Sequence, residues 1–134
     1  MAAEEKELLL KDLCARLPYQ IKVAVVDFDG TIHKRPVTLL RGGWYAEYEN
    51  GEYMFITSYY GIAHKAEEIR PYLRSVSSMT EEERKDLYAM EDKMSFSKDC
   101  PYSPDRSDWY IRHNFDFRGL IEKGLALEAP ESMY

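Results

Sequence analysis

Residues 21–60 read IKVAVVDFDGTIHKRPVTLLRGGWYAEYENGEYMFITSYY and contain most of the strand-forming residues of the chain. β-Branched and aromatic residues favour strands, and the dipeptides Asp29-Gly30 and Asn50-Gly51 favour two-residue hairpin turns. The stretch therefore predicts an antiparallel meander in which 21–28 pairs with 31–40, and 44–49 pairs with 52–60. The registers that these turns imply are Val26 opposite His33, Phe28 opposite Thr31, Tyr48 opposite Tyr53, Ala46 opposite Phe55 and Trp44 opposite Thr57.

The pattern VAVVDFDGTI at 23–32 also resembles the nucleophile loop of the haloacid-dehalogenase-like phosphohydrolases. This resemblance implies Asp27 as the nucleophile that attacks phosphorus, Asp29 as the acid/base for the leaving oxygen, and Mg²⁺ held by both carboxylates. That family also needs a parallel sheet, and the sequence after residue 60 has no continuous Val/Ile/Leu runs. The candidates for its remaining lysine and acidic pair lie in helical or proline-rich surroundings: Lys93, Lys98, Asp105 and Asp108. We therefore favour a hairpin turn, with a phosphohydrolase as the alternative.

The segment before the meander, residues 1–18, predicts an amphipathic helix that packs on the sheet. Its apolar residues recur at helical spacing, and Pro18 ends the pattern. After the meander, Pro71 predicts that 69–76 is a short edge strand or an extended segment, because proline cannot donate a ladder hydrogen bond. Five strands of this kind would form a curved sheet, of which an SH3-like small barrel is one form.

The C-terminal half predicts helices. Thr80-x-x-Glu83 is a capping box that opens a helix, and Ser107 is the expected N-cap of a shorter one. The fold class is therefore α+β in a single domain, with the meander at 19–78, a helical layer at 79–128 and a loosely held tail at 129–134.

Composition limits the function. The net charge of −6 argues against nucleic-acid binding, which remains a further alternative through exposed tyrosines and basic strand residues. The local basic clusters, which we interpret as solvated surface charges, are His33-Lys34-Arg35 with Arg41, and Arg70 with Arg74. The cysteines Cys14 and Cys100 and the three histidines lack metal-ligand spacing, so no metal or other cofactor is expected. No signal peptide or long apolar span is recognisable, which predicts a cytoplasmic protein.

Three pieces of the chain carry a second resemblance: LKDLCARLPY at 10–19, RPYLRSVSSMTEEE at 70–83 and FDFRGLIEKGLALEAPESMY at 115–134. They resemble a family of small uncharacterised proteins encoded in prophages and phage-like mobile elements of gut anaerobic bacteria. The resemblance does not cover residues 25–66 and implies no catalytic residue. We expect a non-catalytic accessory protein that binds an unknown host or phage protein and does not associate with membranes.

Overall fold

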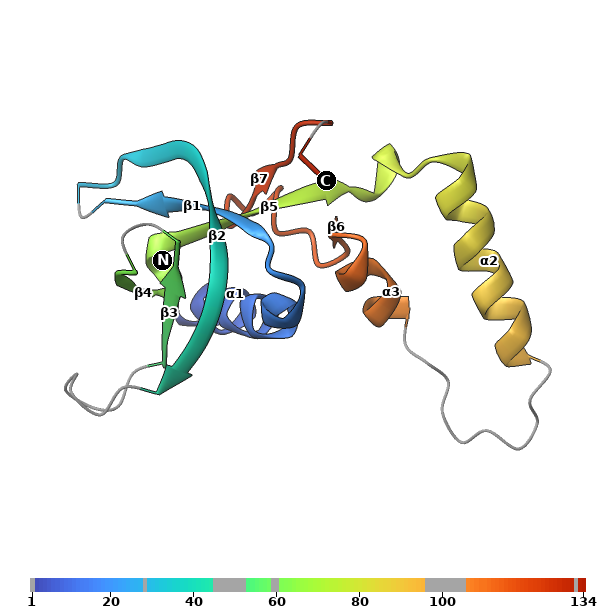
Figure 1. The fold of residues 1–134 in the computed structure, drawn as a ribbon, viewed down its shortest axis with the longest axis horizontal. Coiled ribbons are helices and arrows are strands. Elements are labelled where there is room, and N and C mark those ends of the chain that lie inside the picture. Colours follow the sequence, from blue (N-terminus) through green and yellow to red (C-terminus); the bar gives the residue numbers. More distant parts are fainter. Residues whose placement is uncertain (1, 28, 45–52, 59–60, 96–105, 132) are drawn as a thin grey trace.

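The computed structural model describes residues 2–27, 29–44, 53–58, 61–95, 106–131 and 133–134. In chain order the elements are α1 (Ala3–Arg16), η1 (Leu17–Tyr19), β1 (Lys22–Val26), β2 (Ile32–Trp44), β3 (Tyr53–Thr57), β4 (Ala63–Lys65), η2 (Ala66–Glu68), β5 (Ile69–Ser75), η3 (Val76–Ser78), α2 (Glu81–Ser95), α3 (Arg106–Arg112), β6 (Phe115–Asp116) and β7 (Leu127–Glu128). The predicted α+β class is confirmed: an N-terminal helix, a mostly antiparallel sheet and C-terminal helices (Figure 1).

The described strands form one open sheet in the order β4-β3-β2-β1-β5-β6, with β7 also paired to β5. The pairs β1–β2, β2–β3, β3–β4 and β1–β5 are antiparallel, whereas the short β6 and β7 run parallel to β5. The sheet does not close, so the SH3-like barrel is wrong.

The predicted edge position of 69–76 is also wrong, because β5 pairs with β1, β6 and β7. Residues two apart in a strand direct their backbone groups to the same edge. Leu73 accepts a hydrogen bond from Ala129 beside β7, so Pro71 faces that same edge. β7 begins opposite Tyr72, one residue beyond Pro71. No β7 residue lies opposite the proline, so its missing N–H costs no hydrogen bond in the β5–β7 ladder.

The first hairpin has the predicted antiparallel pairing but a different register. Val25 lies opposite His33 and Val26 opposite Ile32, so the predicted Val26–His33 pair is wrong by one residue. The cause is a longer turn: the N–H of Asp27 donates to the carbonyl of Thr31, and the N–H of Gly30 donates back to the carbonyl of Asp27, each at 2.9 Å. The predicted partner of Thr31, Phe28, lies outside the described residues.

The second hairpin also differs in register. Trp44 lies opposite Tyr53, Gly42 opposite Phe55 and Leu39 opposite Thr57, which contradicts the three predicted pairs. β2 does not break after residue 40 but continues through Gly42. A Cβ atom on Gly42 would lie 2.7 Å from Cε1 of the Tyr53 ring, so only glycine fits at this crossing. The predicted turn at Asn50-Gly51 lies outside the described residues.

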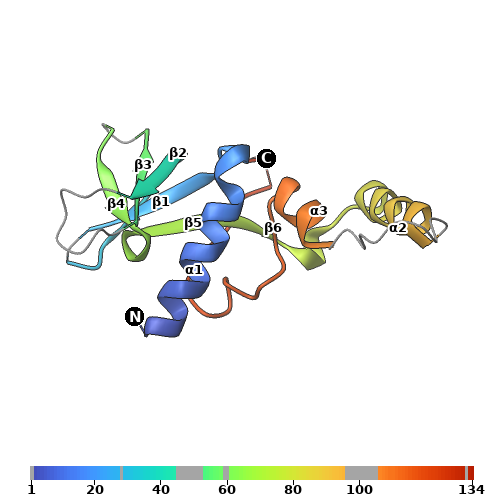
Figure 2. The same cartoon turned by 90° about the horizontal axis from the view of Figure 1, so that it is seen from below.

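Helix α1 packs across the sheet, as its apolar spacing predicted (Figure 2). Its buried Leu9 and Leu13 join a core of strand residues: Ile21, Val23, Leu39, Phe55 and Ile69. Two smaller clusters lie toward the C-terminal half, one around Leu73 and Leu120 and one around Leu87, Trp109 and Phe115.

The capping box before α2 is present. The hydroxyl of Thr80 accepts a hydrogen bond from the N–H of Glu83 at 3.2 Å, and the Glu83 carboxylate accepts from the N–H of Thr80 at 3.1 Å. The predicted N-cap at Ser107 is wrong, because α3 begins at Arg106. Residues 79–128 are not wholly helical, since β6 and β7 extend the sheet there.

Gly30 provides a direct test of the first turn. Its φ is +87°, and nothing lies within 4 Å of the position that a Cβ atom would take. Gly30→Val is therefore expected to lower the free energy of unfolding by about 1–2 kcal/mol through backbone strain alone, as measured by urea denaturation. Gly43→Val is the matched control, because Gly43 has equally open space in a strand without a positive φ. Equal free energies of unfolding for the two variants would contradict the prediction that a side chain at position 30 strains the backbone of the turn.

Candidate binding site

The two aspartates of the DFDGT stretch serve the hairpin. Asp27 follows β1 and lies 2.5 Å from Nε2 of His33, with the two side chains 42% and 45% exposed. Asp29 accepts a hydrogen bond from the N–H of Thr31 at 2.9 Å, and this bond lowers the pKa of its carboxyl group. A general acid near neutral pH needs a raised carboxyl pKa, so the shift runs against the acid/base role.

The structure does not assemble the remaining parts of a phosphohydrolase site around this turn. β1 lies between two antiparallel neighbours, β2 and β5, instead of in a parallel sheet. Asp108 lies on α3, at the opposite end of the sheet from the turn (Figure 1), and Lys98 and Asp105 lie outside the described residues. Within the described ranges, no group of three or more His, Cys, Asp or Glu residues could hold a metal ion.

Of the basic residues on the sheet, two arginines are held by contacts within the protein and two others are exposed. Arg70 donates from Nη1 to the carbonyls of Glu67 and Ile69, and Arg74 pairs with Glu83. Arg35 and Arg41 are exposed on β2, and the side chain of Lys34 is outside the described set. The structure thus leaves few described bases on this sheet for a nucleic-acid backbone.

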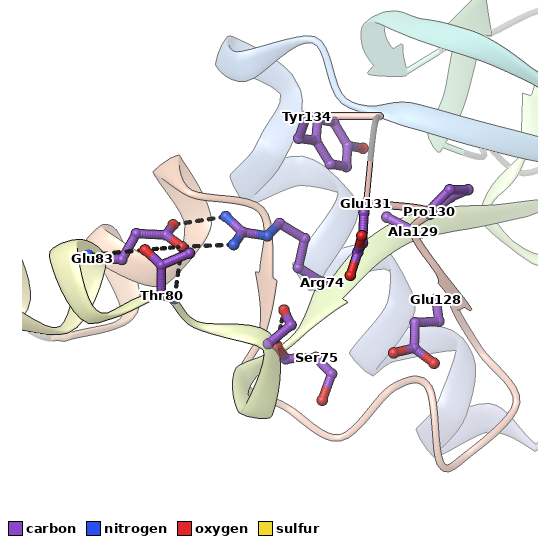
Figure 3. Close-up of a pocket in the computed structure, with 10 residues that line it drawn as sticks. Arg74, Ser75, Thr80, Glu83, Glu128, Ala129, Pro130, Glu131 and Tyr134 are labelled. Atoms are coloured by element: carbon purple, nitrogen blue, oxygen red, sulfur yellow. Dashed lines mark hydrogen bonds and ion pairs between the residues drawn. The ribbon is translucent and has the colours of Figure 1, made fainter.

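A pocket of about 580 Å³ lies where β5 ends (Figure 3). Three segments form it: the end of β5 with η3, the first turn of α2, and the residues from β7 onward. Its lining residues are Arg74, Ser75, Ser78, Thr80, Glu83, Glu128, Ala129, Pro130, Glu131 and Tyr134. Residues 70–83 and 115–134, which are far apart in the sequence, therefore meet at this pocket.

Arg74 and Glu83 neutralise one another at the base of the pocket. Nη1 and Nη2 of Arg74 donate to the two carboxylate oxygens of Glu83, each at 2.7 Å, and the guanidinium lies 4.2 Å from the centroid of the Phe115 ring. The hydrogen bonds from Arg74 lower the pKa of Glu83 to about 2. Glu83 in turn raises the pKa of Arg74.

The other two carboxylates of the pocket are unpaired. Glu128 and Glu131 both line the pocket (Figure 3). Neither glutamate side chain forms a hydrogen bond or ion pair with any described residue. One arginine against three glutamates leaves the lining with two net negative charges, and the remaining polar groups are hydroxyls, which accept as well as donate hydrogen bonds.

A buried charge cluster lies beneath the C-terminal segment. Asp12 and Arg16 of α1 are fully buried, and Asp12 accepts hydrogen bonds from Nε of Arg16 at 2.8 Å and from Nε of Arg118 at 3.0 Å. Arg16 also donates from Nη2 to the carbonyl of Phe115 at 2.7 Å, while its Nη1 has no partner in the described part of the chain. This cluster joins α1 to the C-terminal segment.

Sequence reasoning did not identify the pocket as a site. Glu83 was assigned as a helix cap and Arg74 as a surface base, and 129–134 was expected to be a loose tail. The structure instead bonds Tyr134 to β1 and β5. The sequence feature that could have indicated the pocket is the pair of acids in LEAPES at 127–132, Glu128 and Glu131. Their spacing indicates a site only once the segment is known to lie against β5.

Comparisons of the chain with protein-family models, with curated proteins and with solved structures find no match. None of the described helices has the length and apolar character needed to span a membrane. The pocket is therefore the feature of the molecule from which a function can be inferred.

Proposed function

We propose that the protein is a non-catalytic binding module that receives a basic side chain of a partner protein in the pocket at the end of β5. In this proposal it is an accessory protein of a phage or mobile element and works in the cytoplasm of the bacterial host. The observation that carries the proposal is the pair of unpaired carboxylates, Glu128 and Glu131, in a cavity whose one arginine is already neutralised.

The charge of the pocket selects the class of ligand. An anion would have to displace Glu83 from Arg74 and approach two further carboxylates, whereas a cation meets two unpaired carboxylates. A volume of about 580 Å³ is within the range of ligand pockets and has room for an arginine or lysine side chain with part of its backbone. The net charge of −6 on the whole chain favours the approach of a basic partner from a distance.

The polar groups of the pocket support binding better than catalysis. A nucleophilic mechanism needs a hydroxyl or thiol within reach of a base. Ser78 donates its hydroxyl hydrogen bond to the carbonyl of Ser75, and the Ser75 hydroxyl pairs with that of Ser77. The lining contains neither histidine nor cysteine. Neither serine is therefore paired with a base there. The Thr80 hydroxyl does donate to the Glu83 carboxylate at 3.1 Å, but the pKa of about 2 makes this carboxylate too weak a base to activate a hydroxyl.

The test is a titration of the isotopically labelled protein with a short arginine-containing peptide, followed by amide chemical shifts in NMR spectra. The control peptide carries citrulline, which keeps the shape of arginine without its charge. We expect a Kd near 1 mM, which corresponds to a binding free energy of about −4 kcal/mol. The preference for arginine should be roughly fivefold, because a partly screened ion pair contributes about 1 kcal/mol.

Glu131→Gln is expected to remove most of this preference and to leave the affinity for the citrulline peptide unchanged. Glu122→Gln is the matched control, since Glu122 is exposed and does not line the pocket. Equal affinities for the two peptides, or a Glu131→Gln variant that still prefers arginine, would contradict the proposal.

A further inference from the structure

The residues that follow β7 cross β5 from one edge to the other. The N–H of Ala129 donates to the carbonyl of Leu73 at 2.7 Å, and the hydroxyl of Tyr134 donates to the carbonyl of Tyr72 at 2.9 Å. Carbonyls of consecutive strand residues point to opposite edges. The described residues 129–131 and 133–134, which we name the strap, are therefore fixed on both sides of β5, and Glu131 lies between the two attachments (Figure 3).

The Tyr134 hydroxyl forms a bridge between strands β1 and β5. It accepts a hydrogen bond from the N–H of Lys22 at 3.0 Å while it donates to Tyr72. In the β1–β5 ladder Val23 lies opposite Pro71. The hydroxyl joins Lys22 to Tyr72, which are the next residues outward on the two strands. Burial of this phenol raises its pKa to about 12, so it remains a hydrogen-bond donor at every physiological pH.

We infer that Tyr134 is the positioning residue of the binding pocket: its hydroxyl holds the strap across β5 and thereby places the carboxylate of Glu131 in the lining of the pocket. This inference rests on the proposed function, because the strap supplies one wall of the pocket. A strap attached at one edge alone would carry Glu131 without fixing its distance from Arg74. The preference for a cation then depends on a residue that need not touch the ligand.

Tyr134→Phe tests the inference with little risk to the fold. Tyr134 is 42% exposed overall, so removing its oxygen opens no cavity in the core. We expect the Ala129 amide to exchange with solvent hydrogen about fivefold faster, and the arginine peptide to bind about fivefold more weakly, because one hydrogen-bonded bridge is lost. Tyr19→Phe is the matched control, since Tyr19 is 45% exposed and does not line the pocket.

A double-mutant cycle separates positioning from general loosening. If Tyr134 acts through the carboxylate of Glu131, then Tyr134→Phe should not weaken arginine binding further in a Glu131→Gln background. An equal loss in both backgrounds, or unchanged exchange at Ala129 with peptide binding intact, would overturn the positioning role alone. A wild-type protein that does not distinguish arginine from citrulline would overturn the proposed function and the positioning role with it, while the exchange rate at Ala129 would still show whether Tyr134 holds the strap.

Discussion

Replacement of Asp12 by alanine is expected to lower the free energy of unfolding by about 3–5 kcal/mol, enough to unfold much of the protein at moderate urea concentrations. Asp12 is fully buried and is the shared acceptor of Arg16 and Arg118. Without it, the guanidinium of the fully buried Arg16 has no counter-charge on its own helix and a single described hydrogen-bond partner, the carbonyl of Phe115. An uncompensated buried charge is among the most costly defects in a folded protein.

The measurement is urea denaturation followed by circular dichroism and by tryptophan fluorescence, since Trp109 lies in the nearby C-terminal cluster. Lys11→Ala is the control, because Lys11 is the exposed neighbour of Asp12 on the same helix and should change stability by less than about 0.5 kcal/mol. If Asp12→Ala were no less stable than Lys11→Ala, the cluster would not join the N-terminal helix to the C-terminal segment in solution.

The parts of the fold that follow from neighbouring residues were predictable from sequence. The antiparallel hairpin at Asp29-Gly30, the helix that ends before Pro18 and the Thr80–Glu83 capping box each depend on a few consecutive residues. The structure contains all three, although the turn of the hairpin is longer than the two residues predicted. The register of each hairpin was not predictable, because it depends on turn length and on Gly42 passing beneath Tyr53. A turn dipeptide indicates that two strands pair, but a single added residue shifts every partner.

The position of β5 in the sheet could not be predicted from the sequence for a different reason. Pro71 gave a sound reason to expect an edge strand, since a central strand needs its backbone donors. The structure satisfies the same rule locally, because β7 begins just beyond the proline. β6 and β7 are two residues long and run parallel to β5, so they carry no periodic pattern that could be read from the sequence.

The pocket depends on contacts between distant residues, which the sequence pattern does not predict. Glu83 was recognisable as a cap, but its partner Arg74 was indistinguishable from any other surface arginine. Tyr134 and Tyr72 are 62 residues apart, and the bridge that joins them exists only after β1 and β5 have paired. Asp12 and Arg16 stand four residues apart on α1, where such a pair is usually a solvent-exposed ion pair. Its burial arises from packing against Phe115 and Arg118.

Glu83→Gln is expected to lower the free energy of unfolding by about 2–3 kcal/mol at neutral pH, and this loss should disappear in acid. Glu83 accepts two hydrogen bonds from Arg74 and one from the N–H of Thr80, and Arg74 is the first cause of its low pKa. The glutamine variant keeps the shape of the side chain but loses the charge. It therefore leaves Arg74 beside Phe115 without a counter-charge.

The pH window follows from the direction of the shift. The pKa of Glu83 falls from 4.5 to about 2 on folding, so folding favours the charged form. The stabilisation is complete well above pH 4.5 and is lost as the pH falls through about 2, where the folded protein also takes up the proton. Wild type and Glu83→Gln should therefore differ by a constant amount above about pH 5 and converge below it.

Urea denaturation of both proteins between about pH 7 and pH 2.5 measures this convergence, and Glu82→Gln is the matched control. Glu82 is exposed in the same first turn of α2, so its substitution should have little effect at any pH. A difference between wild type and Glu83→Gln that stayed constant down to pH 2.5 would assign the role of Glu83 to the uncharged hydrogen bonds of the cap. Convergence would show instead that the ion pair with Arg74 fixes the base of the pocket, and so leaves Glu128 and Glu131 as the carboxylates available to a cation.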